Sequence, residues 1–199
     1  MKTVEKTTAW ERFNHLVLLV SFFVLMLTGL GFLFNSLHWM SRIFFGTQLA
    51  ADIHNWAGVV FTASLVLTMG SYLGEALSWS KEDSEWLSGL GGYLSKEKMP
   101  EQGKLNAGQK VFYLVLLVTG LVMAASGLII WLSSAQGPMR WGFVLHNVAN
   151  VVLVTMIPLH VYLATLANPG TARIMGRGTV PLEWAKKKHA KWVRSLGVD

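Results

Sequence analysis

The sequence contains no cysteine, and few of its residues are charged. Without cysteine the chain can form no disulfide, hold no cysteine-ligated iron–sulfur cluster, attach no c-type haem through a CxxCH motif and use no thiol in catalysis. Any metal must therefore be bound by histidine, methionine or oxygen ligands. Charged residues make up 14% of the 199 residues and hydrophobic residues 52%, against about 25% charged residues in an ordinary globular domain. This composition disfavours a water-soluble domain with a single core.

Four long stretches carry no charged residue, namely residues 13–41, 53–74, 111–139 and 141–172. A helix needs about 20 mostly apolar residues, at ~1.5 Å rise per residue, to cross a bilayer, and each stretch exceeds this length. Backbone amides in lipid must be satisfied within their own segment, which favours helices over strands. The sequence therefore predicts one all-α membrane domain over residues 1–199, a bundle of four transmembrane helices at about residues 15–35, 54–76, 111–132 and 144–166. Because no small-x-small cleavage site follows the first stretch, we expect it to remain in the mature protein.

Lysine and arginine lie almost entirely on one side of the predicted bundle. Fifteen of the 17 lie in the N-terminal arm, the loop 77–110 and the tail after residue 167, and only Arg42 and Arg140 lie on the opposite side. By the positive-inside rule both termini are cytoplasmic, in a bacterial inner membrane. We attribute the net charge of +6 to this topology and to attraction for anionic lipids, and expect no nucleic-acid binding.

The tail repeats this pattern. The segment PLEWAKKKHAKWVRSL begins at Pro181 and places Trp184 and Trp192 among five basic residues. We expect an amphipathic interfacial helix over about residues 181–195. The alternative is a disordered basic tail, which would leave both tryptophans in water without a partner.

Four of the six histidines lie in or at the edge of the predicted spans: His15, His54, His146 and His160. Ionisable groups in these positions need a physical reason, although each one alone could be an interfacial anchor or an interhelical hydrogen-bonding group. The other two histidines, His38 and His189, fall outside the spans, and we expect them to be surface residues.

The histidine spacing predicts two pairs. His146 and His160 are 14 residues apart on one helix, which places them about 40° apart in direction and ~21 Å apart in height. In an up-and-down bundle the first helix starts at His15, at the height of His160, and the second starts at His54, at the height of His146. Up-and-down topology therefore pairs His15 with His160 and His54 with His146.

Two imidazole pairs without a supporting carboxylate or thiolate fit six-coordinate haem iron better than zinc, which usually takes three or four protein ligands. Gly29 lies 14 residues beyond His15, at the depth of the other pair, and Gly58 lies one turn from His54; both could make room for a flat macrocycle, or could equally serve helix packing. The four long apolar stretches contain no acidic residue, whereas a cation pathway normally needs acids in mid-membrane; this weighs against the alternative of a haem-free anchor or metal transporter.

The segment NAGQK, residues 106–110, opens the third predicted helix. Asn106 could be a simple N-cap and Lys110 a basic flank, or Asn106, the amides near Gly108 and the side chain of Gln109 could hydrogen-bond a quinone carbonyl near His160. Sequence physics leaves these two readings open. Pro158 loosens the fourth helix beside His160, either to admit a ligand or as a simple kink.

The four histidines at these intervals, together with NAGQK, IPLHVY and the tail RIMGRGTVPLEWAKKKHAKW, resemble the gamma subunit of respiratory formate dehydrogenase, a dihaem cytochrome b. The resemblance covers about residues 10–194, although the loop 81–105 does not match the family pattern clearly. It implies two haems b, with axial ligands His15 and His160 on the cytoplasmic side and His54 and His146 on the periplasmic side. It also implies a menaquinone site formed by Asn106, Gly108, Gln109 and His160.

The resemblance further implies a role in an electron-transfer complex. A periplasmic iron–sulfur subunit, next to a catalytic formate dehydrogenase subunit, would supply electrons that cross two haems to reduce menaquinone; a higher oligomer of the complex is left open. The chain lacks ligands for molybdenum, tungsten or nickel, so we do not expect it to oxidise formate itself. The histidine pattern is shared with cytochrome b subunits of nickel–iron hydrogenases and of sulfur-compound reductases, which leaves the donor and the direction of electron flow open.

Overall fold

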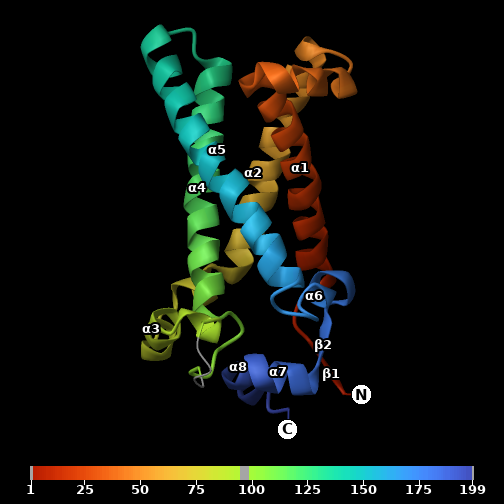
Figure 1. The fold of residues 1–199 in the computed structure, drawn as a ribbon, viewed down its shortest axis with the longest axis vertical. Helices are drawn as coiled ribbons and strands as arrows, with labels where there is room; N and C mark the ends of the chain where they lie inside the picture. Colours follow the sequence, from red (N-terminus) through yellow and green to blue (C-terminus); the bar gives the residue numbers. More distant parts are fainter. Residues whose placement is uncertain (1, 95–98, 199) are drawn as a thin grey trace. The chain divides into compact units, whose positions relative to one another are not determined.

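The computed structural model describes residues 2–94 and 99–198, so Lys96 and Lys98, two of the lysines counted for orientation, lie outside the described residues. Four long helices dominate the fold (Figure 1): α1 Ala9–Leu33, α2 Thr47–Leu77, α4 Ala107–Leu132 and α5 Gln136–Thr165. All four are long and apolar enough to cross a membrane. The prediction of an all-α fold with four spanning helices is confirmed, and the helices extend beyond several of the predicted bounds.

Shorter elements connect the long helices or follow them. They are β1 Thr3–Glu5, η1 Asn35–Phe44, α3 Lys81–Ser88, η2 Leu90–Gly92, α6 Arg173–Arg177, β2 Thr179–Pro181, α7 Leu182–Lys188 and α8 Ala190–Ser195.

The long helices expose many large apolar side chains, as a membrane protein requires. Val20, Val118, Val148 and Val151 are each more than half exposed. In water such a surface would be strongly unfavourable, whereas lipid tails solvate it. Several hydroxyls of these helices bond the backbone of their own helix; Thr62, for example, donates to the carbonyl of Gly58 at 2.8 Å.

The chain forms two compact units, which we describe separately. The first, the helical unit, comprises residues 13–68 and 117–162 and contains all four histidines of the predicted pairs. Its helices approach closely at Gly120, where an added Cβ would come within 2.3 Å of the fully buried Leu65 side chain. In this unit the Ser64 hydroxyl on α2 also donates to the Asn14 carbonyl on α1 at 2.9 Å.

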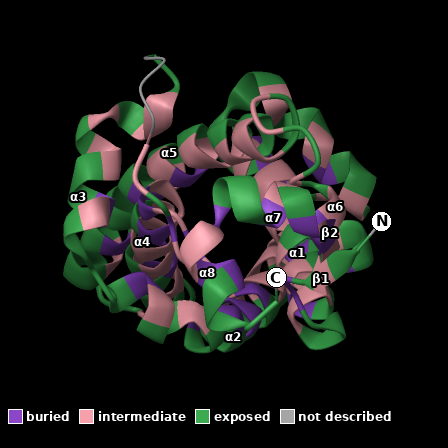
Figure 2. Cartoon of the chain, turned by 90° about the horizontal axis from the view of Figure 1, so that it is seen from below, coloured by how far each residue is buried: buried purple, intermediate pink, exposed green. Residues whose placement is uncertain are grey.

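The second unit, the cap, comprises residues 1–12, 69–116 and 163–199. Strands β1 and β2 pair antiparallel with Val4 opposite Val180. A small apolar core gathers around this sheet, and its buried members on α7 and α8 are among the purple residues of Figure 2. It consists of Ile174, Val180, Leu182, Ala185, Trp192 and Val193.

The tail differs from the predicted continuous helix over 181–195. It forms two helices, α7 and α8, because the backbone of His189 leaves the helical region at φ −141° and ψ 49°. Trp192 is buried in the cap core, so this tryptophan packs against the other residues of that core and is not left in water. Whether the tail also lies in a membrane interface stays a prediction.

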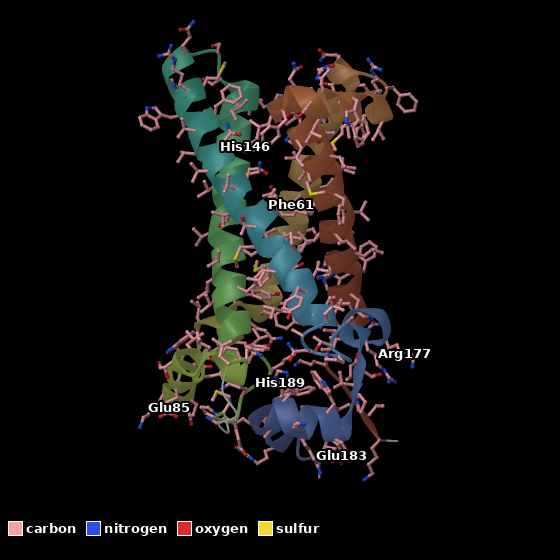
Figure 3. The ribbon with its side chains drawn as sticks, in the orientation of Figure 1. Phe61, Glu85, His146, Arg177, Glu183 and His189 are labelled. Atoms are coloured by element: carbon pink, nitrogen blue, oxygen red, sulfur yellow. The ribbon has the colours of Figure 1, made fainter. Side chains whose placement is uncertain are left out.

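His38 is exposed, as predicted, but the prediction that His189 is a surface residue is wrong. Its side chain is only 3% exposed and lies inside the cap (Figure 3). Nδ1 of His189 bonds the carbonyl of Gly103 at 2.7 Å, and Nε2 lies 2.5 Å from Nζ of Lys6. Because a carbonyl can only accept, His189 carries its proton on Nδ1, and Nε2 accepts from the Lys6 ammonium. Three segments distant in sequence are thus joined at one buried imidazole.

Lys110, the basic residue at the start of α4, is buried rather than solvated. Lys110 is 5% exposed, and its Nζ lies 2.9 Å from Oδ2 of the equally buried Asp83. The ammonium also donates to the carbonyl of Ser78 at 2.6 Å. Burial raises the pKa of Asp83, but the hydrogen bonds from Lys110 and Ser80 outweigh it and lower the pKa, so the pair is ionised. It ties the start of α4 to the end of α2 and to α3.

Candidate functional site

The structure brings the four histidines together as two pairs within the helical unit. The ring centres of His15 and His160 lie 6.5 Å apart, and those of His54 and His146 lie 6.3 Å apart. The two members of each pair come from different helices. On α5, 14 residues separate His146 from His160, which corresponds to about 21 Å of helix rise.

These separations suit two imidazoles on opposite sides of one metal ion. A first-row metal binds an imidazole nitrogen at about 2.0–2.1 Å, and that nitrogen lies about 1.1 Å from its ring centre, so two opposed rings would have centres about 6 Å apart. Direct hydrogen bonding between the rings would bring them closer than this. Each observed pair therefore has room for one ion between its rings.

In the part of the chain that the structure describes, neither pair is joined by a further histidine or by an acidic side chain that could complete a metal site. Among the residues that the structure describes, no three or more His, Cys, Asp or Glu side chains gather as a metal-binding group. Two axial imidazoles with no further protein ligand are what a haem requires, since the porphyrin supplies the other four nitrogens. The residues present thus fit a bis-histidine haem at each pair, and do not fit a small divalent ion such as zinc.

Two buried hydroxyls orient the imidazoles of one pair. Oγ1 of Thr28 lies 2.7 Å from Nδ1 of His54, and Oγ of Ser126 lies 3.0 Å from Nδ1 of His146. Each hydroxyl also donates its hydrogen to the carbonyl four residues earlier in its own helix, at 2.7 Å for Thr28 and 2.6 Å for Ser126. With its hydrogen used, each hydroxyl can only accept from Nδ1–H. Nε2 of both histidines is therefore the unprotonated nitrogen that can bind a metal.

A glycine follows each of these hydroxyl residues and faces the same histidine. An added Cβ at Gly29 would lie 3.4 Å from Cε1 of His54, and one at Gly127 would lie 3.3 Å from Cε1 of His146. The expected placement of Gly29 at the depth of the His54 pair is thus confirmed. The contact at Gly58 is looser, because its nearest neighbour would be Leu25 at 3.9 Å. The same device, a hydroxyl residue followed by glycine, therefore recurs opposite both histidines of this pair.

Sequence reasoning did not identify Thr28, Ser126 or Gly127. All three lie in spans that contain several small and hydroxyl residues, whose usual role is packing or bonding to the helix backbone. The sequence signal that could have identified them is their position along the helix, since each hydroxyl–glycine pair lies at the depth of a histidine on another helix.

The predicted quinone-contacting residues, Asn106, Gly108 and Gln109, lie at the start of α4 in the cap. Asn106 accepts from the backbone amide of Gln109 at 2.8 Å, and Gln109 accepts from the backbone amide of Asn106 at 2.9 Å. This is a reciprocal capping box, so the N-cap reading of Asn106 is confirmed. Both side-chain oxygens are used in the box, and the side-chain NH₂ groups are the donors that a quinone carbonyl could use.

The indole of Trp86 lies over Gly108. An added Cβ at Gly108 would come within 2.9 Å of the Trp86 ring, so only glycine allows this approach. Trp86 also packs edge-on against Tyr93, with ring centres 6.5 Å apart. Trp86 of α3 therefore covers the first turn of α4 at Gly108, with Tyr93 packed behind its ring.

The sequence is similar to known proteins over most of its length. The sequence profile of prokaryotic cytochrome b561 matches residues 6–178. The chain is 32% identical over 199 residues to the formate dehydrogenase cytochrome b556(fdo) subunit of Escherichia coli K12, covering 98% of this chain and 93% of the relative. It is 28% identical over 202 residues to the nitrate-inducible formate dehydrogenase cytochrome b556(Fdn) subunit of the same strain, covering 98% and 92%.

A formate dehydrogenase cytochrome b556 subunit of Haemophilus influenzae is 28% identical over 190 residues, covering 92% of this chain and 79% of that protein. The family match spans most of the chain and includes all four paired histidines. Together with four helices able to cross a bilayer, it identifies an integral membrane protein. The chain belongs to the prokaryotic cytochrome b561 family.

Proposed function

We propose that this protein is the cytochrome b subunit of a formate dehydrogenase complex, which passes electrons from a periplasmic iron–sulfur subunit through two haems b to menaquinone at the cytoplasmic side. The observation that carries the proposal is the opposition of two imidazole pairs at ring-centre distances of 6.3 and 6.5 Å within a family of b-type cytochromes. The names of the relatives support formate as the source of the electrons. The catalytic and iron–sulfur subunits would be separate chains.

His54 and His146 would hold the periplasmic-side haem, and His15 and His160 the cytoplasmic-side haem. A b-type haem bound between such imidazoles supplies reversible one-electron transfer at its iron. The chain's own contribution is to present unprotonated Nε2 atoms, which Thr28 and Ser126 secure for the His54 pair by accepting from Nδ1–H. The apolar helices around the pairs exclude water and competing ligands.

The quinone headgroup would bind near Asn106, Gly108, Gln109 and His160. Its carbonyl oxygens are acceptors, and they suit the side-chain NH₂ groups left by the capping box. The Trp86 indole over Gly108 offers a flat apolar face close to these donors. These residues would fix the headgroup while it takes two electrons and two protons.

The energetics of the membrane limit which donors are suitable. Moving one electron inward against about 150 mV costs roughly 3.5 kcal/mol, so two electrons cost about 7 kcal/mol. A donor couple must lie well below the quinone to supply this energy, and formate does. Electron transfer inward combined with proton uptake at the cytoplasmic side would separate charge without a proton pump.

The test is to purify the chain with its native partners and count haem by the pyridine haemochrome method. We expect two haems b per chain, both reduced by formate and reoxidised by menaquinone. A chain with no haem would refute the cytochrome assignment and support a haem-free anchor. Haems that respond to hydrogen but not to formate would instead identify a hydrogenase subunit.

A further inference from the structure

The cap contains a polar pocket of about 180 Å³ beside the segment that leads into α4. The residues lining it come from the end of α2, the link between α2 and α3, α3, the segment before α4, the first turn of α4 and α8. They are Glu75, Ser78, Ser80, Asp83, Glu101, Gln102, Gly103, Lys110 and Lys191. At about 30 Å³ per water molecule, the pocket has room for several waters with polar partners on its walls.

Two of the three carboxylates in this pocket are held in ion pairs. Asp83 lies 2.9 Å from the buried Lys110 ammonium and also caps α3 through Ser80. Glu101 pairs with Arg194. An anion held by a cation in this way is stabilised in its charged form and is a poor carrier of protons.

The third carboxylate, Glu75, connects the pocket with the start of α4. Its Oε1 accepts from the backbone amide of Leu105 at 3.4 Å, and Leu105 directly precedes Asn106. An added Cβ at Gly103 would come within 2.9 Å of the same oxygen, so glycine allows the loop to pass against the carboxylate. Glu75 therefore lines the pocket and also touches the segment that carries the proposed quinone donors.

Quinone reduction requires protons as well as electrons, and the four charge-free stretches contain no acid that could deliver them. We propose that the pocket is a proton inlet and that Glu75 carries protons from its water to the quinone bound at Asn106 and Gln109. This inference rests on the proposed function. It goes further by naming the group and the route that would serve the reduction.

The proposed reaction balances in two equal rounds. The Glu75 carboxylate takes a proton from pocket water, which the cytoplasm replenishes, and the resulting carboxylic acid gives that proton to a quinone oxygen. Two electrons supplied from the formate side and two such protons convert the quinone to quinol. The Glu75 carboxylate is regenerated after each transfer and exchanges no electrons.

Charged groups from every neighbouring element surround Glu75. The pocket places Lys110, Lys191, Asp83 and Glu101 around it. The ammonium of Lys6, on the N-terminal segment, interacts electrostatically with Glu75 and with Lys104. Asp83 is paired with Lys110, Glu101 with Arg194, and Lys191 with Glu82 on α3. The polar and charged side chains on the pocket walls can hydrogen-bond water in the inlet.

The decisive variant is Glu75→Gln in the intact, membrane-bound complex. The carboxamide oxygen can still accept from the Leu105 amide, so the loop keeps its bond, but the side chain can no longer carry a proton. We expect unchanged haem content, unchanged reduction of both haems by formate, and unchanged binding of a quinone analogue. Reoxidation of the haems by menaquinone should slow by about tenfold or more, and its pH profile should change. Glu75→Asp should restore part of the rate.

Glu85→Gln is the matched control. Glu85 lies on α3 of the same unit, is exposed, and does not line the pocket (Figure 3). This variant should reoxidise at the wild-type rate. If Glu75→Gln also keeps the wild-type rate and pH profile, or if it loses haem or quinone-analogue binding, the proton-inlet proposal is overturned. If the wild-type complex has no haem or cannot reduce menaquinone, the proposed function itself fails.

Discussion

The helical unit and the cap handle polar groups in opposite ways. In the helical unit, Thr28 and Ser126 each bond their own helix and one histidine, and no acidic residue lies within residues 13–51 or 53–68. In the cap, charged side chains themselves are buried, including Lys6 and Lys110. The first arrangement suits cofactor ligands in an apolar medium, while in the second the buried charged groups order the loops of the cap. On the proposed function, the helical unit would carry electrons and the cap would carry protons.

The largest expected effect comes from removing a proposed axial ligand. His160→Ala should lose the haem shared with His15 and abolish menaquinone reduction, while the haem of His54 and His146 stays reducible by formate. The pyridine haemochrome count should fall from two to one per chain. His38→Ala, at an exposed histidine, is the control and should retain both haems. Loss of both haems from a folded His160→Ala protein would contradict the pairing.

A smaller but still large effect should follow in the cap when the buried ion pair is broken. Lys110→Met leaves the Asp83 carboxylate buried without its cation, and we expect a loss of about 3–5 kcal/mol in the free energy of unfolding. Adding Asp83→Asn should recover part of the loss, because no charge is then stranded. Lys81→Met breaks an exposed pair with Glu85 and should cost less than about 1 kcal/mol. Equal losses for Lys110→Met and Lys81→Met, in denaturant titrations, would show that the buried pair has no special role.

The cap should also be the more acid-sensitive unit. Burial, reinforced by the Lys6 charge, lowers the pKa of His189 from 6.5 to about 3. The unfolded chain therefore binds a proton between about pH 6.5 and pH 3 that the folded chain does not, so this group's contribution to stability is present above pH 6.5 and is lost as the pH falls.

Thermal unfolding followed from pH 8 to pH 4 checks this point. The melting temperature of wild type should fall more steeply below pH 6.5 than that of His189→Gln, whereas His38→Gln should follow wild type. Parallel curves for wild type and His189→Gln would show that the acid sensitivity arises elsewhere.

The smallest effect concerns the orienting hydroxyls of the helical unit. Thr28→Val removes the acceptor for Nδ1–H of His54, which makes the imidazole a weaker donor to iron and disfavours the oxidised state. A hydrogen bond of about 1 kcal/mol corresponds to about 40 mV for one electron, so the midpoint potential of that haem should rise by up to this amount. Thr62→Val is the matched control, because Thr62 bonds the Gly58 carbonyl. Equal potentials in the two variants, by optical redox titration, would contradict the orienting role.

The features that the sequence predicted well depend on local properties. The lengths of the charge-free stretches are enough to predict the four helices. A 14-residue interval on one helix places His146 and His160 at two depths, independently of the other helices. The pairing of the histidines then follows if neighbouring helices run antiparallel. The capping box of Asn106 and Gln109 is likewise contained within four residues.

The features that the sequence missed depend on contacts between distant segments. His189 is buried because Lys6 and Gly103 meet it from positions far along the chain. Lys110 resembles any basic flank until Asp83 is placed beside it. The local sequence does not distinguish Thr28, whose hydroxyl bonds His54, from Thr62, whose hydroxyl bonds the Gly58 carbonyl. In each case the fold, rather than the residue type, decides the role.

The most direct test of the central claim is the near-infrared magnetic circular dichroism of the purified, oxidised protein, because this spectrum reports the axial ligands of low-spin haem. We expect two low-spin haems per chain, both with the signature of two imidazole ligands, which the pairs His15 with His160 and His54 with His146 would supply. A band typical of methionine–imidazole ligation, a high-spin haem with an open position, or a single haem per chain would contradict this expectation.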